Sequence, residues 1–189
     1  MNDIEQRIKD DNVDFMEKVW TVIKEDYPGA YYLPAEATGE SVAKELDFKA
    51  GIDGFIVGDD YMISVANRLL RMDFHTFTIR ATKTNSNTTH DNTELKKRLD
   101  AVHSGGLKLY PNITIQSYVV DGEFKRASII KTEDLYRLIR KWDAFEFPKT
   151  FGSTWWFNNT GNASFLCIHF RFLKANYPDL KLYGVDYDY

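Results

Sequence analysis

Residues 47–80 read DFKAGIDGFIVGDDYMISVANRLLRMDFHTFTIR, and most of this stretch carries strand patterns. Residues 51–57 begin a short apolar run that ends at a Gly-Asp-Asp turn at 58–60. Residues 61–70 predict a second strand, and residues 74–83 predict a third with clear alternation of apolar and polar side chains. Consecutive strands joined by short turns predict a sheet built partly from hairpins.

The rest of the chain supplies helices and further strands. The sequence predicts helices over 3–25, 93–102, 132–142 and 171–177, a hairpin of strands 113–120 and 123–131, and a last strand at 164–170. Asp121-Gly122 is the strongest hairpin signal, because both residue types suit a tight two-residue turn. Residues 30–39 and the aromatic-rich residues 143–162 show no regular pattern. We therefore expect one α/β (α+β) domain over 1–189, with a mixed, hairpin-containing sheet flanked by helices.

Size and charge narrow the function classes. The chain of 189 residues is long enough for one domain with a substantial core. Its net charge of −4 argues against a protein that coats nucleic acid non-specifically, because that binding depends on cations that neutralise phosphates. A local basic groove, a metal site whose carboxylates are offset by bound cations, and a basic protein partner all stay compatible with this charge.

Cysteine content and hydropathy indicate the cellular compartment in which the protein is expected. The one cysteine, Cys167, lies in the apolar run 165–170, which favours a small buried hydrophobic residue over a nucleophile. The first residues, MNDIEQRIKDDN, are polar and lack the apolar region of a signal peptide. No apolar stretch approaches the length of a membrane span. We therefore expect a cytoplasmic protein that does not insert into a membrane.

Asp53 and Arg68 are the first candidates for a functional site. Asp53 stands near the start of one predicted strand, and Arg68 lies fifteen residues later on the next. If the two strands form a hairpin, both side chains lie near its open end. A carboxylate fixed there suits a divalent cation, and a guanidinium beside it suits the charge on a phosphate. The alternative is a surface ion pair of little energetic consequence.

Asp53 and the later Ala66-Asn67-Arg68 pattern resemble the PD-(D/E)XK nuclease superfamily, whose core runs helix, three strands, helix, strand. The resemblance covers about residues 10–140 and leaves 143–189 as an aromatic-rich extension. It implies a restriction-endonuclease-like core in which Asp53 matches the first metal-binding Asp and Arg68 the family's Lys. Ala66 stands where the family has its second acid, so the usual pair of carboxylates is incomplete.

Two further acids enter through the same resemblance. Asp47 resembles an extra acid of phage-encoded and mobile-element members, and Glu17 resembles an accessory carboxylate on the first helix. The resemblance thus implies a divalent-metal-dependent nuclease acting on DNA or RNA, in which Asp53, Asp47 and Glu17 hold Mg²⁺ or Mn²⁺. Asp53, Asp47 and Arg68 are its catalytic candidates. Either Asp47 or Glu17 substitutes for the missing acid, or the site is inactive.

Several cations follow the candidate site along the chain. Arg68, Arg71, Arg80 and Lys83 are followed by Lys96, Lys97 and Arg98 on the next predicted helix. Together they are candidates for one nucleic-acid path. For the last three, a solvated helix face is the alternative.

Trp155 and Trp156 suggest a different kind of function. A double Trp in an irregular segment suits a stacking platform, a protein-docking patch or a lid on the core. Together with the acidic charge and the missing second acid, it also fits a non-enzymatic binder on a nuclease-like scaffold. Small phage inhibitors of the anti-CRISPR type are of this kind, and the partner would be a nucleic-acid-handling enzyme.

Overall fold

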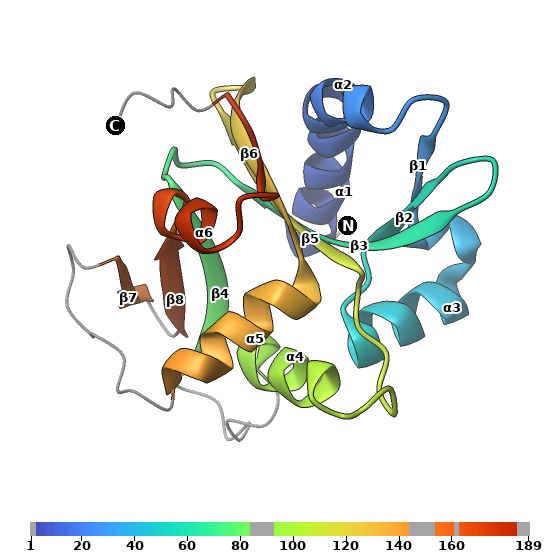
Figure 1. The fold of residues 1–189 in the computed structure, drawn as a ribbon. Helices are drawn as coiled ribbons and strands as arrows, with labels where there is room; N and C mark the ends of the chain where they lie inside the picture. Colours follow the sequence, from blue (N-terminus) through green and yellow to red (C-terminus); the bar gives the residue numbers. More distant parts are fainter. Residues whose placement is uncertain (1–2, 84–92, 144–153, 161–162, 185–189) are drawn as a thin grey trace.

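The computed structural model describes residues 3–83, 93–143, 154–160 and 163–184. Its strands form two sheets that are flanked by helices (Figure 1). The expectation of an α/β (α+β) fold with a mixed sheet is therefore confirmed.

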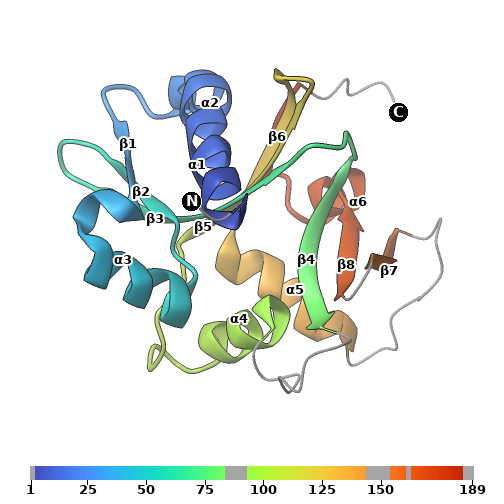
Figure 2. The same cartoon turned by 180° about the vertical axis from the view of Figure 1, so that it is seen from behind.

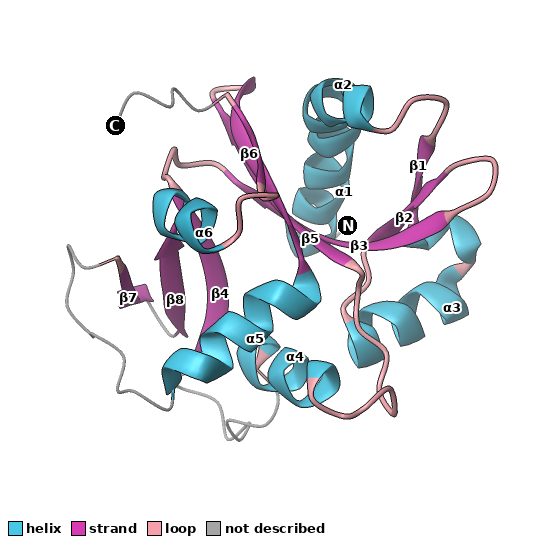
Figure 3. Ribbon diagram, in the orientation of Figure 1, coloured by secondary structure: helices cyan, strands magenta, loops and turns pink. Residues whose placement is uncertain are grey.

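The larger sheet has six strands, and the smaller sheet has three. In spatial order, the larger sheet consists of β1 (Tyr31–Pro34), β2 (Gly54–Val57), β3 (Met62–Leu70), β5 (Ile113–Val120), β6 (Glu123–Lys131) and β9 (Lys181–Tyr183). The smaller sheet consists of β4 (Thr76–Lys83), β8 (Ala163–His169) and β7 (Trp155–Thr160). Figure 3 shows how the strands separate into these two groups.

The α-helices of the described residues are α1 (Asp3–Asp14), α2 (Trp20–Ile23), α3 (Glu40–Glu45), α4 (Glu94–Val102), α5 (Thr132–Asp143) and α6 (Phe170–Asn176). A π-helical turn over Phe15–Val19 joins α1 to α2, and a second one over Leu46–Ala50 follows α3. Short 3₁₀ turns over Lys24–Asp26 and Ala35–Thr38 complete the helical segments.

The larger sheet is mixed because one pair of neighbours is parallel. β3 pairs with β5 in parallel from Val65↔Ile113 to Leu70↔Tyr118, whereas the other neighbours are antiparallel. A parallel pair requires a long crossover, and here the crossover contains β4 and α4. The crossover therefore brings α4 close to the loop that precedes β2, as contacts between α4 and the turn after α3 show.

The β5–β6 hairpin forms where the sequence predicts it. Asp121 and Gly122 connect the strands with φ angles of 52° and 76°. Positive φ at both central residues is the requirement of the type I′ turn, and glycine meets it without a steric cost.

In Figure 2, α2 lies on one face of the larger sheet, and α5 with the smaller sheet lies on the other. Two apolar cores contain residues of these elements. The first packs α2 and the π-helical turn before it against the sheet, with Phe15, Val19, Ile23, Ile56 and Ile115 among its fully buried side chains. The second fills the space between the two sheets, α5 and α6, and includes Phe77, Tyr118, Leu135, Leu166 and Phe170. Cys167 is buried in the smaller sheet, as expected.

The edge of β4 that does not face β8 bonds to side chains of the larger sheet. The hydroxyl of Tyr118 donates to the carbonyl oxygen of Thr76. The N–H of Thr78 donates to Gln116 Oε1 at 3.2 Å, and Arg68 Nη1 donates to the carbonyl oxygen of Thr78 at 2.9 Å. We call the edge formed by Thr76 and Thr78, together with these three hydrogen bonds, the outer edge of β4. It joins the sheets through side chains and covers an edge that would otherwise expose unpaired backbone groups.

Several elements differ from the sequence-based expectation. β1 forms inside residues 30–39, and β7 forms inside residues 143–162, where no regular structure is predicted. β4 joins the smaller sheet rather than continuing from β3. The strand predicted over 51–57 begins only at Gly54.

The helices are too short or too polar to cross a bilayer wherever the chain is described.

Candidate functional site

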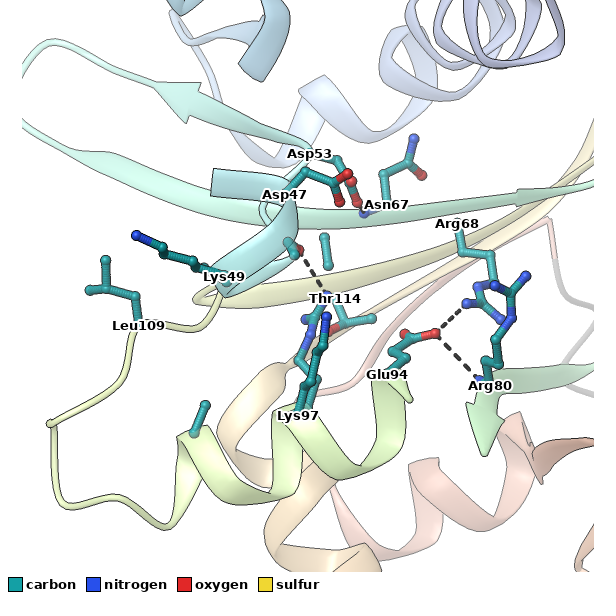
Figure 4. A pocket seen from close by; sticks show the side chains of 15 residues that line it. Asp47, Lys49, Asp53, Asn67, Arg68, Arg80, Glu94, Lys97, Leu109 and Thr114 are labelled. Atoms are coloured by element: carbon teal, nitrogen blue, oxygen red, sulfur yellow. Dashed lines mark hydrogen bonds and ion pairs between the residues drawn. The ribbon is translucent and has the colours of Figure 1, made fainter. Parts of the chain in front are cut away.

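A cavity of about 320 Å³ lies between the start of β2, β3 and α4 (Figure 4). Eight charged side chains line it: the acids Asp47, Asp53 and Glu94, and the cations Lys49, Arg68, Arg80, Lys97 and Arg98. We call it the Asp53 cavity. It therefore unites the three catalytic candidates Asp53, Asp47 and Arg68 with Arg80 of the predicted nucleic-acid path.

Asp53 is held at the start of the β2–β3 hairpin by backbone contacts. Its N–H donates to the carbonyl oxygen of Val65 at 2.8 Å, and its Oδ2 accepts the N–H of Asn67 at 2.6 Å. Burial raises the pKa of Asp53 to about 7, an effect that the Asn67 N–H and the charge of Arg98 only partly oppose. A carboxylate with this pKa lacks a sufficient counter-charge.

Asp47 reaches the same cavity from the π-helical turn after α3. Gly51 ends that turn in the left-handed region at φ +59°, and its N–H donates to the carbonyl oxygen of Asp47 at 2.8 Å. The side chain of Asp47 is exposed, and its negative charge adds to the effects that raise the pKa of Asp53. The turn thus places two carboxylates in one cavity.

Arg68 is tied to its neighbours in this cavity. Its guanidinium makes an ion pair with Glu94 and donates to the carbonyl oxygen of Thr78. Glu94 Oε2 also accepts the backbone N–H of Arg80 at 3.3 Å (Figure 4). The Arg68 guanidinium therefore connects β3, α4 and the outer edge of β4. These contacts give Arg68 a structural role that does not depend on catalysis.

Glu94 is a site residue that sequence reasoning missed. Glu94, Lys97, Arg98 and Ala101 all line the cavity, and their spacing of three and four residues is that of one helix face. Thr93 begins the helix as its N-cap, because its side chain accepts the N–H of Lys96. The sequence predicts the helix over 93–102, but it does not predict the direction in which this face points.

Arg98 departs from the expectation of a solvated helix face. Its side chain is only 7% exposed. Its Nη2 donates to the carbonyl oxygen of Gly51 at 2.8 Å, whereas its Nη1 is buried and has no hydrogen-bond partner in the described part of the chain. Lys96, by contrast, is exposed and pairs with Asp100 at 2.8 Å, as a solvated face predicts.

The remaining predicted residues do not meet in this cavity. Glu17 is exposed on the first π-helical turn and lines neither cavity that contains Asp53. Arg71 makes ion pairs with Asp11 and Asp14 on α1. Lys96 is exposed and does not line the cavity, and the side chain of Lys83 lies outside the described residues.

Trp155 and Trp156 occupy different environments on β7. Trp155 is 7% exposed, belongs to the core around the smaller sheet, and lies with its ring centroid 6.3 Å from that of Phe172. Trp156 is half-buried, and its ring centroid lies 4.9 Å from that of His169. Trp155 thus packs as the predicted lid on the core would, and Trp156 is the more accessible ring of the pair.

Asp53 and Asp47 also line a second, acidic hollow of about 710 Å³. Its other acids are Asp11, Glu36 and Glu40, and Lys44 is its cation. The two carboxylates therefore lie where an acidic hollow meets a cavity with more cations than acids.

A divalent cation fits the chemistry of Asp53 and Asp47. Mg²⁺ keeps several of its waters and takes only one or two protein carboxylates, so a dense cluster of ligands is not required. In the described part of the chain, no three His, Cys, Asp or Glu side chains gather as a preformed metal site. The fit therefore rests on two carboxylates and on the missing counter-charge of Asp53.

Comparison with protein-family models, with curated proteins and with solved structures gives no match.

Proposed function

We propose that this chain is a divalent-metal-dependent nuclease that hydrolyses phosphodiester bonds of DNA or RNA. The observation that carries the proposal is the Asp53 cavity, in which two carboxylates suited to a cation lie beside Arg80 and Lys97. Phosphoryl transfer needs both: cations that stabilise charge on the phosphate, and carboxylates that hold a metal.

The order of elements supports the nuclease resemblance. The chain order also includes α2 before β1, α3 between β1 and β2, and β4 of the smaller sheet between β3 and α4. Apart from these three elements, α1 is followed by the larger-sheet strands β1, β2 and β3, then by α4 and β5. This order of helix, three strands, helix, strand is the one that the resemblance implies. The first of the three strands is β1, which the sequence did not predict. Asp53 directly precedes the second strand, and Ala66 and Arg68 lie on the third.

Asp53 and Asp47 would hold Mg²⁺ or Mn²⁺. When bound, the ion would polarise the phosphate and lower the pKa of a coordinated water. The Asn67 N–H fixes Asp53, and Arg80 and Lys97 line the same cavity, where their positive charge would lie beside the reacting phosphate. Arg68 contributes its charge from the ion pair with Glu94.

The test is cleavage of labelled single- and double-stranded DNA and RNA in Mg²⁺, Mn²⁺ or EDTA. We expect metal-dependent cutting that falls by about 100-fold or more in Asp53→Asn, the order seen when one group that stabilises a transition state is removed. Asp59→Asn is the matched control, because Asp59 is an exposed acid in the turn after β2. Undiminished cutting by Asp53→Asn, verified as folded, would exclude this site.

A non-enzymatic binder is the second candidate, and two observations favour it. Ala66 supplies no carboxylate at the position of the family's second acid, and Arg68 is already engaged by Glu94 and Thr78. In this function the acidic chain binds the basic surface of a nucleic-acid-handling enzyme, and the complex weakens as salt screens the contact. A wild-type chain that cuts no substrate with either metal would favour this candidate.

A further inference from the structure

Arg98 is a buried cation whose environment leaves one of its two terminal nitrogens unsatisfied. The side chain is 7% exposed, and Nη1 has no hydrogen-bond partner among the described residues. Burial of a charged group without compensating partners is unfavourable, so such a group is retained where something binds it. The side chain lines the Asp53 cavity, which offers room for a ligand.

The guanidinium is held in place from the opposite side. Nη2 donates to the carbonyl oxygen of Gly51 at 2.8 Å. A Cβ at Gly51 would lie 2.7 Å from Nη2, so glycine at this position makes room for Arg98 as well as ending the turn. The anchored guanidinium leaves Nη1 as the terminal nitrogen for which the described residues supply no acceptor.

The charges around Arg98 favour an anion. Five cationic side chains and three carboxylates line the cavity, although the whole chain carries a net charge of −4. Lys97 and Arg80 lie in the same cavity as Arg98. A cleft with locally excess positive charge concentrates anions, and the planar guanidinium matches the oxygens of a phosphate.

We infer that Arg98, with Lys97 beside it, binds a phosphate group in the Asp53 cavity. The inference rests on the proposed function for the identity of that phosphate, which would be a backbone phosphate of the nucleic acid next to Asp53. The Arg98 guanidinium donates to a non-bridging oxygen, and Lys97 contributes its charge at the cavity wall. The Gly51 carbonyl is the positioning group for the guanidinium.

The test is binding of inorganic phosphate in EDTA, measured by titration calorimetry and by the phosphate-dependent rise in melting temperature. We expect Arg98→Gln to weaken phosphate binding by about 10- to 100-fold, the factor that one hydrogen bond to a charged group contributes. Lys97→Gln changes a less buried position and is expected to weaken binding several-fold. Lys96→Gln removes one charge from the same helix outside the cavity and should leave binding unchanged.

Two outcomes would overturn the inference. One is wild-type phosphate binding weaker than about 10 mM. The other is equal weakening in Lys96→Gln and Lys97→Gln, which would reduce the effect to the overall charge of α4. If Arg98→Gln does not fold, the comparison of Lys97→Gln with Lys96→Gln decides.

Two further arms identify the source of the phosphate. Oligonucleotides with and without a 5′-phosphate separate a backbone phosphate from a terminal one, because only the terminal site requires the added group. Asp53→Asn separates this inference from the proposed nuclease. It abolishes cleavage if the nuclease proposal is right and retains phosphate binding in EDTA if Arg98 is the phosphate ligand.

Discussion

At the scale of single residues, the cavity combines side chains that differ in how well their charges are compensated. Arg68 and Glu94 neutralise each other, whereas Asp53 has a backbone N–H and the more distant charge of Arg98. Asp53 could be singled out from the sequence, because an acid at the start of an apolar strand is a local pattern. Glu94 and Arg98 could not, because their roles depend on where the crossover places α4.

The raised pKa of Asp53 predicts a specific pH dependence of stability. The folded chain keeps the proton up to a pH of about 7, whereas the unfolded chain releases it near the ordinary value of 3.8. The free energy of unfolding should therefore fall as pH rises between these two values, by at most about 3 kcal/mol between pH 5 and pH 8.

Asp53→Asn should remove this contribution, so the variant gains stability relative to the wild type at pH 8 but much less at pH 5. Urea unfolding in EDTA at both pH values measures the difference, and Mg²⁺ should reduce it by stabilising the ionised wild-type carboxylate. Asp59→Asn is the control for loss of a charge. An identical difference between Asp53→Asn and wild type at both pH values would contradict the raised pKa.

At the scale of elements, local sequence signals were enough to predict a helix or hairpin where a turn or a cap determines the structure. The Asp121-Gly122 hairpin and the Thr93-capped helix form where the sequence predicts them. β1 was missed because it is four residues long and ends in a proline. β7 was missed because adjacent aromatic residues show no alternation, although Trp155 and Trp156 point to different environments.

The N-cap of α4 carries a prediction at this scale. The side chain of Thr93 accepts the Lys96 N–H at 3.3 Å, so Thr93→Ala should lower the free energy of unfolding by about 1 kcal/mol. Thr93→Ser keeps the hydroxyl and should retain most of that stability. Urea denaturation of both variants checks the expectation. An equal loss in the two variants would assign the effect to the buried methyl group instead.

At the scale of the whole molecule, the division of the strands into two sheets depends on contacts that no local sequence pattern predicts. The mixed α/β class follows from the succession of helices and strands, but the departure of β4 into a separate sheet does not. β4 pairs with β8, which lies far along the chain, and its other edge bonds to side chains of β3 and β5. Alternation within β4 is the same for either sheet, so the sequence leaves its partner open.

The buried hydroxyl of Tyr118 provides the test of this connection. It donates to the carbonyl oxygen of Thr76, and the ring is fully buried. Tyr118→Phe removes the bond while keeping the ring, so the free energy of unfolding should fall by about 1–2 kcal/mol. Tyr61→Phe, at a ring that is 38% exposed, should change it little. A negligible change in Tyr118→Phe, measured by urea denaturation, would show that this bond does not stabilise the junction of the sheets.

The late position of β8 in the chain has a consequence for synthesis on the ribosome. β4 emerges long before β8, and in that interval it has neither its strand partner nor a completed core to lie against. A strand whose edge lacks its partner can pair with the same strand of another nascent chain. We therefore expect chains that end before Ala163 to aggregate. Chains that include β8 and α6 can complete the smaller sheet and should not aggregate.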